Sequence, residues 1–145
     1  MRQKKAKGMK TPGLPPGTLI HVGERKVEHV SISLMEYSDS RFQERTVEKV
    51  EEYGPPEDSE TISWINVNGL HDVEVLEKLG KLFGLHPMVL EDILNTNQRP
   101  KFEDVDTHLL VILRMLYPDN RGETPNDEQV SIIVGPRYVI TFQER

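Results

Sequence analysis

The segment FGLHPMVLEDILNTNQRPK, residues 83–101, predicts a short helix that carries two adjacent acids. Proline is favoured at the first position of a helix because it has no N–H to lose there and its φ is preset, so we expect a helix from about residue 87 to residue 95. Glu91 and Asp92 interrupt an otherwise apolar run at residues 88–94, and no basic residue lies within a helical turn of them. The role of these two carboxylates is the main question that the sequence raises.

Helical geometry separates the acids from the expected core. At about 100° per residue, one side of the helix is apolar and the other carries the acids. The apolar side comprises Val89, Leu90, Ile93 and Leu94, and the other side Met88, Glu91, Asp92 and Asn95. The ordinary interpretation of such acids is a solvated surface. The apolar Met88 among carboxylates instead favours contact with a partner or a cation.

A second helix is predicted immediately upstream, in HDVEVLEKLGKLFG. Asp72 lies near its N-cap, Gly84 lies at its C-terminal stop, and its apolar residues recur at helical spacing. These apolar residues are Val75, Leu76, Leu79, Leu82 and Phe83. The pattern predicts an amphipathic helix that packs on a sheet.

Strand-like runs flank the two helices. Downstream, KFEDV, HLLVILRMLY, EQVSIIV and RYVITFQ predict an antiparallel meander. Upstream, we expect strands at residues 18–22 and 27–37, joined by a hairpin around residues 23–26, and a buried strand at 61–67 with Trp64 in the core. Residues 38–60 predict a helix followed by a loop. The order predicts an α/β (α+β) domain with a mixed sheet.

Composition limits the function. The 145 residues suffice for one domain, residues 18–145, preceded by a flexible basic arm at residues 1–17. The net charge of −6 argues against nucleic acid, and the absence of cysteine excludes thiolate metal sites and favours a reducing compartment. The longest apolar run, residues 109–116, is far shorter than the ~20 residues that cross a bilayer, so we expect a soluble chain.

No motif for catalysis is present. His71 and His86 could be imagined as a zinc site, but they lack ligand spacing and each lies where a helix begins, which favours capping or loop packing. Adjacent helical acids diverge and do not clasp a substrate from two sides. No nucleophile elbow, P-loop or dinucleotide-binding motif occurs, so we expect no enzyme.

The motifs WINVNGLHD, LGKLFGLHPMVLEDILNTNQRPKFED, LRML, EQVSIIV and FQER resemble the cytoplasmic N-terminal domain of CorA-type magnesium and cobalt transporters. The resemblance covers residues 14–145 and is weakest at 38–60. It implies a central mixed, largely antiparallel sheet sandwiched between helices, on the cytoplasmic side of an inner-membrane homopentamer. It also implies that the stalk and transmembrane helices lie outside this chain, which alone would be monomeric or weakly associated.

The resemblance also assigns a role to the acids. Asp92 matches a residue of a regulatory divalent-cation site between subunits, and Glu91 is a plausible second contributor; the opposing acid belongs to the neighbour's stalk. The implied cation is Mg²⁺, with Co²⁺ or another divalent ion as alternatives, and its binding favours the closed channel. Two other functions stay open: a related transporter of different selectivity, such as zinc, and a stand-alone metal-dependent enzyme.

Overall fold

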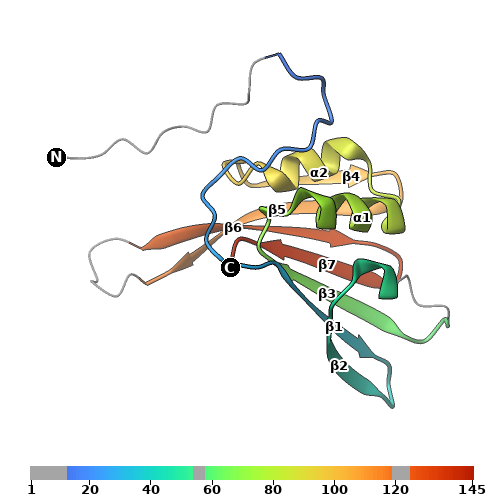
Figure 1. Cartoon of the computed structure of the whole chain (residues 1–145). Helices are drawn as coiled ribbons and strands as arrows, with labels where there is room; N and C mark the ends of the chain where they lie inside the picture. The colour runs from blue at the N-terminus through green and yellow to red at the C-terminus, as the bar shows by residue number, and fades with distance from the viewer. Residues whose placement is uncertain (1–12, 54–57, 119–124) are drawn as a thin grey trace.

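The computed structural model describes residues 13–53, 58–118 and 125–145, which form a seven-stranded mixed sheet with two helices (Figure 1). The strand order is β2-β1-β3-β7-β6-β5-β4, and this arrangement confirms the predicted α/β class. In chain order, the elements are β1 (Ser31–Tyr37), β2 (Phe42–Val47), the 3-10 turn η1 (Val50–Glu52), β3 (Ile62–Asn68), α1 (Val73–Phe83), α2 (Pro87–Leu94), β4 (Lys101–Val105), β5 (His108–Tyr117), β6 (Asn126–Val134) and β7 (Tyr138–Gln143).

The C-terminal half forms the predicted meander. Strands β4 to β7 pair in sequence, each antiparallel to the next. The mixed character comes from one parallel pair, β3 with β7, which the chain connects through both helices and the meander. Strand β1 pairs with the other side of β3 in antiparallel fashion and completes the sheet with β2.

The prediction for residues 38–60 was wrong. Instead of a helix, the chain forms an edge strand, β2, whose register runs from Ile32 opposite Val47 to Tyr37 opposite Phe42. The charges of this segment are accommodated because most of β2 is exposed, and charged side chains are common on edge strands. The β-branched Thr46 and Val47 were the residues that favoured a strand. The expected loop falls partly on residues 54–57, outside the described residues.

The predictions for residues 18–26 also fail. No strand forms at residues 18–22 and no hairpin joins it to β1, which begins at Ser31 rather than at residue 27. Val22 makes an isolated parallel bridge with Asn95 instead. The Val22 amide donates to the Leu94 carbonyl at 3.0 Å, and the Thr96 amide donates to the Val22 carbonyl at 3.0 Å. This segment is therefore attached to the end of α2, not to the sheet.

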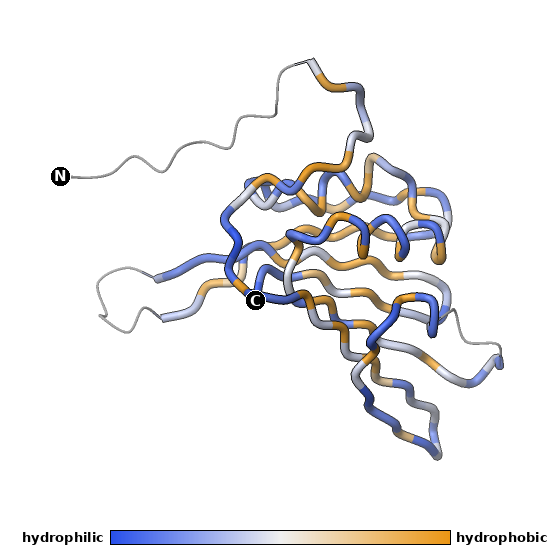
Figure 2. Tube along the Cα trace, viewed as in Figure 1, coloured by the Kyte–Doolittle hydropathy of each residue, from blue (hydrophilic) through white to orange (hydrophobic). Residues whose placement is uncertain are grey.

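The core lies between one face of the sheet and the two helices. Alternate strand residues and the inner sides of α1 and α2 form one buried cluster. Figure 2 shows that apolar and polar residues are interspersed along these elements. The largest fully buried members of this cluster are Leu34, Ile65, Leu70, Leu76, Leu79, Ile93, Leu94, Leu110, Ile112, Ile133, Ile140 and Phe142. Burial of this apolar surface is the main stabilising term of the fold.

The opposite face of the sheet is half-exposed and carries both apolar and polar side chains. Trp64 was expected in the core, but β3 buries only alternate residues, and the Trp64 side chain is 41% exposed on the opposite face. Its indole nitrogen donates to the Thr141 hydroxyl at 2.9 Å. Leu113 and Met115 of β5 are exposed to similar extents. Both helices in the described residues lie on the core side, so the second helical layer that the resemblance implies stays a prediction.

None of the helices in the described parts of the chain is long and apolar enough to span a membrane. The expected basic arm at residues 1–17 can be followed only in part, because residues 1–12 lie outside the described residues.

Candidate functional site

Helix α2 is fixed at its start by local capping. His86 is the N-cap, and its Nδ1 accepts a hydrogen bond from the Met88 amide at 3.2 Å. Pro87 occupies the first turn, where a missing N–H costs nothing. The predicted capping role of His86 is therefore confirmed. Among the described residues, no group of three or more His, Asp or Glu side chains is arranged to hold a metal ion.

The predicted sidedness of α2 is confirmed. Val89, Leu90, Ile93 and Leu94 are buried, whereas Glu91 and Asp92 are partly exposed and Met88 is 43% exposed. The acids therefore lie at the outer surface of α2, above the core. This arrangement leaves their carboxylates able to meet groups from outside the domain.

Asp92 nevertheless has a basic partner, contrary to the inference from the local sequence. Lys101, the first residue of β4, places its Nζ 2.6 Å from Asp92 Oδ2 and 2.9 Å from Glu103 Oε1. Burial lowers the pKa of Lys101, but the hydrogen bonds to Asp92 and Glu103, together with the negative charges of these acids, outweigh burial and raise the pKa overall. The ammonium is therefore charged at neutral pH. The single ammonium of Lys101 thus forms ion pairs with two carboxylates.

The other oxygen of Asp92 is also hydrogen-bonded. The Gln98 side-chain amide donates to Asp92 Oδ1. Gln98 and Lys101 both belong to the segment that follows α2, so this segment folds back over the helix and holds Asp92 from two sides. The Asp92 and Lys101 side chains are 22% and 24% exposed, respectively, so the pair is screened less than a fully exposed ion pair.

Glu91 is engaged by a different segment. Its Oε2 accepts a hydrogen bond from the Gly17 amide at 2.8 Å. Residues 13–22, which we call the N-terminal strap, pass over the outer side of α2, and a groove of about 270 Å³ lies between the strap and the helix. Leu14 and Ile20 of the strap line this groove together with Met88. The strap therefore accounts for the apolar Met88 beside the acids.

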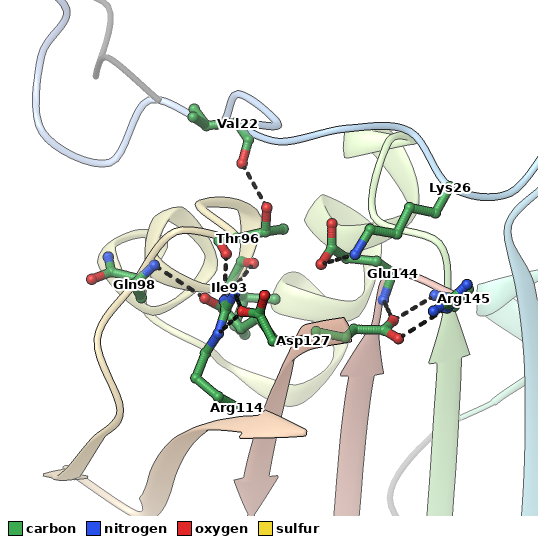
Figure 3. A network of polar contacts seen from close by, with 11 residues as sticks. Val22, Lys26, Ile93, Thr96, Gln98, Arg114, Asp127, Glu144 and Arg145 are labelled. Atoms are coloured by element: carbon green, nitrogen blue, oxygen red, sulfur yellow. Dashed lines mark hydrogen bonds and ion pairs between the residues drawn. The ribbon is translucent and has the colours of Figure 1, made fainter. Parts of the chain in front are cut away.

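The loop after α2 is held in place from beneath by a buried glutamine. Gln129 of β6 is fully buried; its Oε1 accepts from the Gln98 amide at 3.2 Å, and its Nε2 donates to the Ile93 carbonyl at 3.4 Å. Arg114 donates to the Thr96 carbonyl at 2.8 Å and forms an ion pair with Asp127 (Figure 3). No local pattern indicates these contacts, because Gln129 lies 31 residues from Gln98.

A second polar cluster lies at the end of β7 and has a structural role. Lys26 pairs with Glu144 at 3.0 Å, and buried Glu128 accepts hydrogen bonds from the backbone amides of Glu144 and Arg145 (Figure 3). Nearby, burial lowers the pKa of His21, against an opposing effect of Glu144. These contacts satisfy the buried charges and tie the last strand to the preceding one.

The chain is similar in sequence to known metal-ion transport proteins. A sequence model of CorA-like Mg²⁺ transporter proteins matches residues 59–145. The chain is 41% identical over its whole length to the cobalt/magnesium transport protein CorA of Thermotoga maritima, and it spans 40% of that protein's length.

Two solved structures share the fold. The soluble domain of CorA from Methanocaldococcus jannaschii matches with a TM-score of 0.51 and 18% identity, over 75% of this chain and 39% of that one. The ZntB cytoplasmic domain from Vibrio parahaemolyticus matches with a TM-score of 0.58 and 18% identity, over 79% of this chain and 43% of that one.

The α/β domain and its outward carboxylates thus occur in a chain whose relatives are metal-ion transport proteins. The chain belongs to the family of CorA-like Mg²⁺ transporter proteins. Its relatives are transporters rather than enzymes, which agrees with the absence of catalytic motifs from its sequence.

Proposed function

We propose that this chain is the divalent-cation-sensing regulatory domain of a CorA-type Mg²⁺/Co²⁺ transport channel, on the cytoplasmic side of the membrane. The observation that carries the proposal is the position of Asp92: it projects from the outer side of α2, in a group where Asp92 and Glu103 share the single ammonium of Lys101. Such an excess of carboxylates at a surface attracts cations.

The donor chemistry suits Mg²⁺. This ion prefers oxygen ligands, keeps several waters and often takes only one or two carboxylates from a protein. Asp92 supplies an anionic oxygen. Glu91 is the second contributor, with a smaller share because its position on the helix is offset by about 100° from that of Asp92. The remaining ligands would be waters and an acid of the neighbouring subunit, which lies outside this chain.

Cation binding between subunits would favour the closed channel. Carboxylates facing each other at about 4 Å repel by ~1–4 kcal/mol, depending on the local dielectric, unless a cation lies between them. The cation therefore stabilises the state in which the subunits are close together. Loss of the cation would loosen the assembly and favour opening.

Weak sites suffice if the assembly is a homopentamer. A site that binds in one state only contributes RT ln(1 + [L]/Kd), which is about 1.1 kcal/mol at five times Kd. Five such sites supply about 5.3 kcal/mol, close to the ~5.5 kcal/mol that moves a two-state equilibrium from 1:99 to 99:1. A sensor of abundant cytosolic Mg²⁺ requires sites of this weak kind.

The structural likeness to a ZntB domain leaves one alternative function open. This function is that of a transporter of zinc or another ion with the same cytoplasmic architecture. The likeness concerns the fold, whereas the whole chain is 41% identical to a cobalt/magnesium transport protein, which favours Mg²⁺ or Co²⁺. Measured flux of Mg²⁺, Co²⁺ and Zn²⁺ through the full-length protein in liposomes would distinguish the two.

The test of the sensing role uses the full-length protein in liposomes, with Mg²⁺ varied on the side that this domain faces. Asp92→Asn removes an anionic ligand from every subunit and should move inhibition to higher Mg²⁺. Glu91→Gln should act in the same direction but less strongly. Glu77→Gln, at an exposed position of α1, is the matched control and should change nothing. Unchanged Mg²⁺ inhibition in Asp92→Asn would refute the proposal.

A further inference from the structure

The Lys101 ammonium lies beside the Asp92 carboxylate, at the place where an incoming cation would bind. Its Nζ lies 2.6 Å from Asp92 Oδ2, within direct hydrogen-bond distance. The second oxygen, Oδ1, accepts from the Gln98 side chain. Both oxygens of Asp92 are thus hydrogen-bonded within the chain. The acid that carries the proposed function is therefore already paired within the chain, with an ammonium that it shares with Glu103.

The position of Lys101 is set by the fold rather than by the flexible side chain alone. Lys101 is the first residue of β4, and its backbone pairs with Ile112 of β5. Its side chain is 24% exposed, so the ammonium is partly enclosed between Asp92 and Glu103. A tethered charge of this kind has a high local concentration at Asp92, as linked binding groups generally do.

We propose that Lys101 is a built-in competitor for the divalent cation at Asp92 and that it sets the affinity of the sensor. This inference rests on the proposed function of Asp92. A divalent cation and an ammonium that share one carboxylate repel each other, so cation binding requires Lys101 to move away. Glu103, 2.9 Å from the same Nζ, provides a second carboxylate that can keep the displaced ammonium. Each binding event is then an exchange of a tethered cation for a free one.

The competition gives a directional expectation. Without the ammonium, the cation no longer displaces a bound charge, and the local charge becomes more negative. Lys101→Met keeps the length and apolar character of the side-chain stem but removes the charge. In the full-length protein, this variant should bind Mg²⁺ about three- to tenfold more tightly than the parent, since the pair is only partly exposed. Lys101→Arg keeps a charge near Asp92 and should stay close to the parent.

The measurement is the half-saturating Mg²⁺ concentration, Kd, fitted from the rise in melting temperature of the full-length protein in detergent, which grows with ln(1 + [L]/Kd). Flux into liposomes is the second readout. Lys78→Met is the matched control, because Lys78 also pairs with two acids, Glu51 and Glu74, but lies on α1 away from Asp92. It removes the same charge from the molecule and should leave the half-saturating concentration unchanged.

A double variant separates this inference from the proposed function. If Asp92→Asn weakens Mg²⁺ binding and Lys101→Met has no effect, the sensing role stands and the competition is refuted. If Lys101→Met tightens binding equally in the Asp92→Asn background, Lys101 acts through general charge, and the competition is also refuted. The expected result is that the Lys101→Met effect disappears when Asp92 is replaced.

Discussion

Replacement of Gln129 tests how the fold holds the segment that carries the contacts to Asp92. Gln129 is fully buried under the end of α2, where it accepts from the Gln98 amide and donates to the Ile93 carbonyl. Gln129→Met has a similar volume, so it creates little cavity, but it removes the side-chain donor to the Ile93 carbonyl. It also removes one of the two acceptors of the Gln98 amide, which still donates to the Asn95 carbonyl at 3.2 Å. Each buried polar group left unsatisfied costs about 1–3 kcal/mol.

The expected loss of stability is about 2 kcal/mol, from one unsatisfied buried carbonyl and one weakened hydrogen bond of the Gln98 amide. For a domain of this size the melting temperature should fall by roughly 6 °C. Thermal and urea unfolding of the chain measure this change. Gln43→Met on the exposed edge strand β2 is the control and should stay within about 0.5 kcal/mol. A change below about 0.5 kcal/mol in Gln129→Met would refute the proposed support of the α2 loop.

Two further predictions concern the chain as a whole. Burial, and then the neighbouring Tyr53, raise the pKa of Tyr138 from 10.0 to about 12, so its contribution to stability should be complete below pH 10 and lost as the pH rises from 10 to about 12. Urea midpoints measured across this interval should fall in the parent and fall less in Tyr138→Phe. The chain alone should sediment at micromolar concentration as a monomer or a weakly associated species, because it spans only 40% of the length of the Thermotoga maritima CorA; a tight pentamer would contradict this.

The two helices and the meander could be predicted because their signals are local. Asp72 accepts hydrogen bonds from the amides of Glu74 and Val75, and Gly84 ends α1 with a φ of 64°, in the left-handed region that glycine tolerates. The antiparallel strands follow one another with short connections, so sequence order gives their pairing. In these parts, local pattern and tertiary structure agree.

The edge strand and the N-terminal strap could not be predicted, because tertiary contacts decide their conformation. Residues 42–47 are strand because β1 offers a free edge, and their charges point to solvent on either side of it. The strap lies against α2 because Val22 pairs with Asn95 and Gly17 with Glu91, residues more than 70 positions away. Residues 18–22 have strand propensity and are not helical, but they form no strand because they do not lie beside the sheet.

The position of the candidate site could be predicted from the sequence, but the pairing of Asp92 with Lys101 could not. Helical periodicity correctly placed Glu91 and Asp92 on the outer side of α2. A search for partners within one helical turn missed Lys101, because the chain turns after Asn95 and returns to the helix nine residues beyond Asp92. Predicting the pair would require the path of residues 95–101, which depends on buried Gln129 and on Arg114.

The exchange at Asp92 determines how the proposed sensor would respond. If n equivalent sites bind only in the closed state, closure is half complete when (1 + [L]/Kd) raised to the power n equals the intrinsic preference for opening. The midpoint concentration is then proportional to Kd, whatever the value of n. A change of Kd at Lys101 therefore shifts the midpoint by its full factor. A tenfold change in the intrinsic opening preference, in contrast, changes 1 + [L]/Kd by a factor of only about 1.6 when n is five. Variants of Lys101 and Asp92 should thus shift the set point in direct proportion to the change that they make in Kd.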